Sequence, residues 1–100
     1  MTTLEKKVWK KLEKVLDPEL NVPIVELGLV YKVKVKEDKA KITMTLTSVG
    51  CPLFGLIEET VKEKIKELEE INNVEIDLTF DPPWTMEKMS EKAKLKLGLV

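Results

Sequence analysis

Two neighbouring runs of alternating apolar and polar residues constrain the fold of this chain more than any other feature. Residues 30–36 read VYKVKVK and residues 41–47 read KITMTLT. Period-two alternation is typical of a β-strand with one buried and one solvated face. Because residues 37–39 form a turn-like link between the runs, the sequence predicts an antiparallel hairpin whose lysines face water.

Amphipathic helices are expected on both sides of this hairpin. The first begins with a capping-box signal, Thr2 with Glu5 three positions on. It should end near Leu16, because Pro18 disfavours helical geometry at Asp17. Pro52 should open the second helix, since a first-turn position needs no N–H. The residues expected on the buried stripe of this second helix are Leu53, Leu56, Ile57, Val61, Ile65 and Leu68.

A third strand and a short last helix complete the predicted order. Residues 74–80 alternate again, and the prolines after Asp81 end that strand. A helix should follow around Ser90 to Leu97, with Gly98 just past its end and Met86 and Met89 as packing residues. The order α-β-β-α-β-α predicts an α/β (α+β) fold: one two-layer domain over residues 1–100, with a three-stranded sheet and helices on one face. The place of the third strand in the sheet is left open.

The composition excludes several classes of partner. The 17 basic residues, all lysine, and the 18 acidic residues give a net charge of −1, which removes the electrostatic case for nucleic-acid binding. No apolar run is long enough for a membrane span, and the first residues lack a signal-peptide pattern. The Lys/Glu-rich, Gln-free composition is compatible with a thermophilic source. A lone cysteine fits a reducing interior, so we expect a cytoplasmic protein.

Cys51 is the single cysteine, and the chain has no histidine. Standing just before Pro52, it is expected near a helix start, where free N–H groups and the helix dipole favour the thiolate. One thiol cannot by itself hold an iron–sulfur cluster or a structural zinc ion. Cysteine-protease chemistry lacks its base, so we expect no enzyme. Cys51 is therefore either a small packing residue or one part of a site that another molecule completes.

Two loops carry the other candidate residues. Asp17-Pro18-Glu19 places two carboxylates in a rigid turn, where Asp17 either bonds local amides or lies close to Cys51. Pro83 and Trp84 follow the third strand. The indole either packs over the core or lines a pocket or a partner surface.

Several segments together resemble the metal–sulfur cluster biosynthesis family, which includes SufT-like, PaaD-like and cytosolic iron–sulfur assembly factor domains. The resemblance covers nearly the whole chain, up to Gly98. It rests on these stretches in this order: residues 16–20 (LDPEL), 25–31 (VELGLVY), 45–47 (TLT), 50–52 (GCP) and 78–84 (LTFDPPW).

The resemblance implies an accessory or carrier protein in iron–sulfur cluster assembly. Carried over by position, Cys51 is the shared cluster or metal ligand. Asp17, Glu19 and Thr47 line the pocket beside it, and Trp84, Pro83, Gly50 and Pro52 complete the surroundings. The chain ends without the extra cysteines of PaaD-like members that serve an oxygenase system, which favours the general role.

The implied cargo is an iron–sulfur cluster, held transiently and not stably by one chain alone. A second copy in a homodimer, a small thiol or the recipient would supply the other ligands. The implied partners are iron–sulfur assembly proteins and apo-client proteins. The alternative is a binding module without chemistry, which docks an assembly ATPase or a client through the Trp84 loop while Cys51 is structural.

Overall fold

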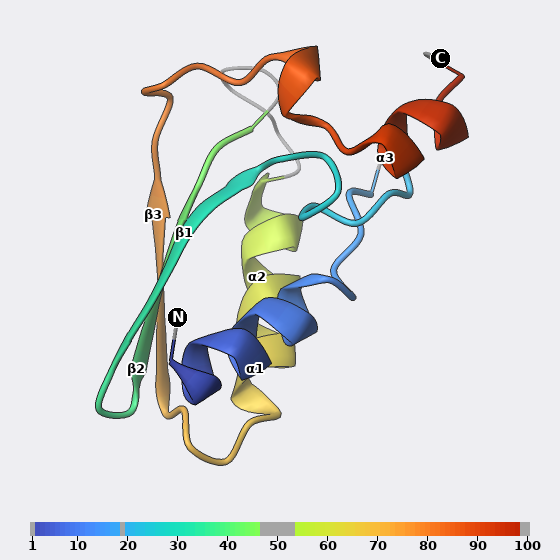
Figure 1. Ribbon diagram of the computed structural model, residues 1–100. Helices are drawn as coiled ribbons and strands as arrows, with labels where there is room; N and C mark the ends of the chain where they lie inside the picture. The colour runs from blue at the N-terminus through green and yellow to red at the C-terminus, as the bar shows by residue number, and fades with distance from the viewer. Residues whose placement is uncertain (1, 19, 47–53, 99–100) are drawn as a thin grey trace.

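The computed structural model describes residues 2–18, 20–46 and 54–98 (Figure 1). Its elements, in chain order, are α1 (Thr3–Leu12), β1 (Val30–Lys36), β2 (Lys39–Met44), α2 (Phe54–Lys66), β3 (Asn73–Leu78), the 3₁₀ helix η1 (Met86–Lys88) and α3 (Glu91–Lys96). No helix among these residues is long and apolar enough to cross a membrane.

The strands form one sheet in the order β1-β2-β3. β1 and β2 are the predicted antiparallel hairpin, with Lys36 opposite Lys39 and an irregularity in register between Val30 and Lys32. β3 runs parallel to β2, with Asn73 opposite Lys39. The third strand, whose position the sequence left open, is therefore an edge strand that α2 connects to the middle of the sheet.

Helices α1 and α2 lie on the same side of the sheet (Figure 1). α1 contacts β1 and α2, and α2 contacts β3. The core between these layers is mainly apolar, and its largest buried side chains include Leu12, Ile42, Met44, Ile57 and Ile65. The predicted α/β class, with helices covering one face of a three-stranded sheet, is confirmed.

The first helix begins as expected and ends earlier than expected. Thr2 and Glu5 form the predicted capping box. The helix stops at Leu12, not near Leu16, because the backbone after it turns into an extended pairing. Leu16 forms a bridge with Pro23, and the Ile24 N–H donates to the Val15 carbonyl at 2.9 Å. These bonds compete with further helical turns.

The buried stripe of α2 is narrower than predicted. Ile57, Val61 and Ile65 are buried at four-residue spacing, whereas Leu56 is 54% exposed. Adjacent residues on a helix point about 100° apart, so Leu56 cannot share the face of Ile57. The predicted start of α2 at Pro52 and the burial of Leu53 lie outside the described residues.

The C-terminal part agrees with the prediction in most respects. Ser90 caps α3 through a bond from the Ala93 N–H, and Gly98 has φ 75°. Met89 is buried as expected. Met86 is 53% exposed, so the prediction that it is a packing residue is wrong. Met86 lies in η1, which spans three residues and buries none of them.

Candidate functional site

Asp17 lies in a short, closed loop. Its N–H donates to the Val22 carbonyl at 2.9 Å, and its own carbonyl accepts the Asn21 N–H at 2.7 Å. One carboxylate oxygen, Oδ1, accepts the Leu20 N–H at 3.0 Å. This last bond is the local amide contact that the sequence offered as one interpretation. It fixes the position of the carboxylate at the surface of the loop.

The segment around Glu26 holds the C-terminal part of the chain. The backbone N–H of Ser90 donates to the Glu26 carbonyl at 2.8 Å. The Ser90 hydroxyl donates to the Glu26 carboxylate. The same hydroxyl accepts the Ala93 N–H, so one serine both caps α3 and fastens it. These bonds fix α3 beside the loop that precedes β1.

Trp84 is fastened to the same segment. Its indole Nε1 donates to the Leu27 carbonyl at 2.7 Å, and the ring is partly buried against the core. Next to this bond, Gly28 has φ +76°, and its missing Cβ would lie 2.2 Å from the Lys88 carbonyl oxygen. The backbone of η1 therefore lies so close to the backbone at Gly28 that only glycine fits at this position.

Tyr31 joins the same arrangement from the start of β1. Its hydroxyl donates to the Pro82 carbonyl at 2.9 Å, and the Lys88 ammonium lies 5.1 Å from the centre of its ring. Such a distance permits a cation–π attraction. Residues 82–90 are thus held along residues 26–31 at both ends.

The structure describes three of the predicted site residues, Asp17, Pro83 and Trp84. Asp17 lies in the closed loop, Trp84 is anchored on Leu27, and Pro83 is exposed. The remaining predicted site residues lie outside the described part of the chain: Glu19, Thr47, Gly50, Cys51 and Pro52. The described chain leads toward Thr47 through Thr45 and Leu46, which are both buried.

The approach to that segment is held on two sides. The Thr45 N–H donates to the Leu29 carbonyl at 2.8 Å, and the Thr79 N–H donates to the Met44 carbonyl at 2.9 Å. The Thr45 hydroxyl is fully buried and has no hydrogen-bond partner among the described residues. The residue just before β1 and the residue just after β3 therefore hold the described chain at the end of β2.

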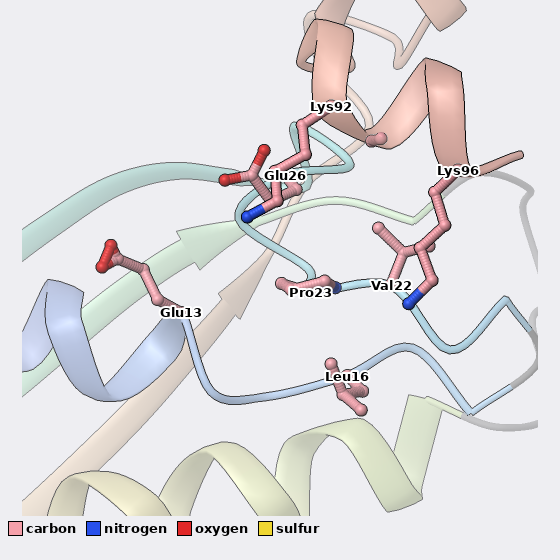
Figure 2. A pocket seen from close by; sticks show the side chains of 8 residues that line it. Glu13, Leu16, Val22, Pro23, Glu26, Lys92 and Lys96 are labelled. Carbon is pink, nitrogen blue, oxygen red and sulfur yellow. The ribbon is translucent and has the colours of Figure 1, made fainter.

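A pocket of ≈ 410 Å³ lies between the Asp17 loop and α3, and Figure 2 shows its lining. Its lining residues are Glu13, Leu16, Val22, Pro23, Glu26, Lys92, Ala93 and Lys96. Lys92 and Lys96 come from one face of α3, and the Lys96 ammonium donates to the Asn21 carbonyl at 2.9 Å. The arrangement combines an apolar floor with a rim of both charges.

Sequence reasoning did not find this pocket. Its parts come from the end of α1, the loop before β1 and α3, and the four-residue spacing of Lys92 and Lys96 was the single local signal. Among the described residues, no group of three or more cysteine, histidine or carboxylate side chains has a metal-binding arrangement.

Comparison with known proteins identifies the class. Residues 5–78 match the model of the family described as iron-sulfur cluster assembly protein. The matched range runs from α1 to the end of β3 and includes the Asp17 loop and Cys51. The chain belongs to the iron–sulfur cluster assembly protein family.

Individual relatives are similar over nearly the whole chain. The Fe-S protein maturation auxiliary factor YitW of Bacillus subtilis is 48% identical, with 96% of this chain and 95% of that protein covered. The Fe-S protein maturation auxiliary factor SufT of Staphylococcus aureus is 46% identical over 85% of this chain and 98% of its own. A crystal structure of a domain of unknown function from Bacillus anthracis superposes with a TM-score of 0.91 at 45% identity, covering 97% of this chain and 93% of that one.

Proposed function

We propose that this protein is an accessory factor in the maturation of iron–sulfur proteins, and that an iron–sulfur cluster is its cargo. The observation that carries this proposal is the 48% identity, over almost the full length of both chains, to a protein described as a maturation auxiliary factor. The protein acts with iron–sulfur assembly proteins and apo-client proteins, and it carries out no catalysis of its own.

In this role Cys51 supplies one ligand to the cluster. Its thiolate is the soft, metal-binding form of the side chain, and the chain has no histidine to share the task. A cluster takes about four protein ligands, so the others come from a second copy, a small thiol or the recipient protein. A site of this kind holds its cargo transiently, which suits transfer better than storage.

Asp17, Glu19 and Thr47 surround this thiol in the proposed site, with Gly50 and Pro52 on either side of it. Support for the role of Asp17 comes from its closed loop, where the bond from the Leu20 N–H holds the carboxylate in one place. Trp84 and Pro83 border the site from the C-terminal side. The hydrogen bond from Trp84 Nε1 to the Leu27 carbonyl supports a fixed position of the Trp84 ring at this border of the site.

The test is anaerobic reconstitution with iron and sulfide, followed by transfer to an apo-protein acceptor. We expect the wild type to show thiolate-to-iron charge-transfer absorbance and to restore the acceptor. Cys51→Ser should lose both, since an alcohol is a poor ligand for iron in clusters. Native mass measurement of the loaded protein reports whether one or two chains hold the cargo.

Asp17→Asn is the companion variant, because it keeps the shape of the loop and removes the charge. We expect this variant to load or transfer the cluster more slowly while it unfolds at nearly the wild-type denaturant concentration. Equal spectra and equal transfer by the wild type and Cys51→Ser would contradict the ligand role. A loss of acceptor binding in Trp84→Phe, with Cys51→Ser unaffected, would point to a docking module instead.

A further inference from the structure

The face of the sheet opposite α1 and α2 carries a concentration of lysines. No described element covers this face (Figure 1). The register places Lys34 directly opposite Lys41, and Lys36 directly opposite Lys39, with Lys32 in the next row beside Thr43. All of these lysines are exposed.

Charge compensation on this face is uneven. Glu75 on β3 lies 3.3 Å from the Lys39 ammonium and 3.9 Å from that of Lys41. Within the described residues, the structure shows no salt bridge for Lys32, Lys34 or Lys36. Like charges directly opposite each other destabilise a sheet. The β1 side of this face therefore carries positive charge that no salt bridge among the described residues compensates.

We propose that this lysine face, defined as Lys32, Lys34, Lys36, Lys39 and Lys41, docks an acidic surface of a partner protein. Carboxylates of the partner would relieve the repulsion between the opposed lysines and would steer the encounter. This inference does not depend on the iron–sulfur role, because it rests on the strand register and on charge alone.

The pattern of charge favours a protein over a nucleic acid or a lipid surface. Glu75 and Asp77 continue the same rows on β3, so the face changes sign from β1 to β3. A phosphate-bearing polymer would meet repulsion at β3, whereas a folded protein can present acidic and basic groups in the matching order. The face also lacks arginine, the side chain preferred for bidentate phosphate contacts.

The test measures binding of the full-length protein to a fluorescent peptide of alternating glutamate and serine at low salt. We expect the triple variant Lys32→Glu/Lys34→Glu/Lys36→Glu to weaken binding about tenfold or more. Its unfolding midpoint should stay close to that of the wild type, because Lys34→Glu gains a carboxylate opposite Lys41 but loses the attraction between Lys34 and Glu5. Loss of binding together with retained stability separates docking from folding.

The matched control is Lys6→Glu/Lys10→Glu/Lys66→Glu, which changes the net charge equally on the helical side. We expect this control to change binding less than about twofold. An equal loss in both triple variants, or no binding of the peptide by the wild type, overturns the proposal. Tighter binding of an oligonucleotide or of phosphatidylglycerol vesicles than of the peptide overturns it as well, as does a dimer that the first triple variant dissociates.

Discussion

At the scale of single residues, Gly28 is the position where the backbone leaves no room for a side chain. Its φ is +76°, and an added Cβ would lie 2.2 Å from the Lys88 carbonyl oxygen. We expect Gly28→Ala to lower the free energy of unfolding by about 3 kcal/mol, from backbone strain and displacement of η1 together. Urea denaturation followed by circular dichroism measures this loss.

Gly55 provides the control for that substitution. It lies in the first turn of α2, and a Cβ there would meet nothing within 4 Å. Gly55→Ala should stabilise the protein by about 0.5 kcal/mol, because alanine loses less chain entropy in a helix. A Gly28→Ala variant that is as stable as the wild type, or that gains stability as Gly55→Ala does, would refute the close approach of η1 to Gly28.

Trp84 is the second residue whose role is defined by one contact. Trp84→Phe keeps an aromatic ring against the core and removes the Nε1 bond to the Leu27 carbonyl. We expect a loss of about 1–2 kcal/mol, since the partly buried carbonyl is left without this donor. Trp9→Phe is the matched change in α1, because the Trp9 ring also packs against the core and its indole has no hydrogen bond to a residue that the structure describes. An equal loss in both variants would mean that ring size, and not the hydrogen bond, sets the cost.

At the scale of elements, Glu5 joins α1 to the edge of β1. Its carboxylate accepts the Thr2 N–H at 2.9 Å and the Val35 N–H at 3.0 Å. These backbone bonds, first from Thr2 and then from Val35, lower the pKa of Glu5, and the charge of Lys34 lowers it further. One side chain thus caps the helix and satisfies an amide on the open side of β1.

A carboxyl group whose pKa is lower in the folded state stabilises the fold at pH values above its unfolded pKa. The contribution of Glu5 is fully present above its unfolded pKa of 4.5 and is lost as the pH falls through the lower folded pKa. We expect Glu5→Gln to be less stable than the wild type at neutral pH, and the difference to shrink below pH 4.5. Thermal unfolding at a series of pH values measures this convergence.

Glu70→Gln is the control that distinguishes the stability contributed by the backbone hydrogen bonds of Glu5 from that of an exposed salt bridge. Its side-chain bond to Lys7 is the largest cause of a lowered pKa at Glu70, but that pair is exposed and salt screens it. High salt should therefore remove the small effect of Glu70→Gln and leave that of Glu5→Gln. A Glu5→Gln variant whose stability difference is independent of pH would contradict the assigned bonds.

Most of the helices and strands could be predicted from the sequence, because both follow local periodicity. The capping box at Thr2, the hairpin and the cap of α3 all depend on neighbours within a few residues. The end of α1 and the exposure of Leu56 could not be predicted in this way. The first depends on the pairing of Leu16 with Pro23, and the second on which face of α2 meets the sheet.

The candidate site was predicted mainly through resemblance, and its framework was not predicted. The fixed position of Trp84 depends on Leu27, which is distant in the sequence. The bond from Ser90 to Glu26 is equally distant. Periodicity describes each segment separately, so it cannot show that residues 82–90 lie along residues 26–31.

At the scale of the whole molecule, the part of the chain after β3 extends beyond the range of the family match, which ends at residue 78. The structure nevertheless builds this part into the domain. Met89 is 6% exposed and Ala93 is 1% exposed, and both belong to the core cluster. We infer that the C-terminal part unfolds together with the sheet and the two long helices.

Met89 and Met86 test this inference as a matched pair three residues apart. Met89→Ala should cost about 2–4 kcal/mol of unfolding free energy, because it leaves a cavity in the core. Met86→Ala should stay within about 0.5 kcal/mol of the wild type, because Met86 is 53% exposed. Urea unfolding monitored both by tryptophan fluorescence, to which Trp84 contributes, and by far-ultraviolet circular dichroism should give one coincident transition. Separate transitions, or a Met89→Ala variant that alters the fluorescence transition alone, would show that the C-terminal part folds independently of the domain.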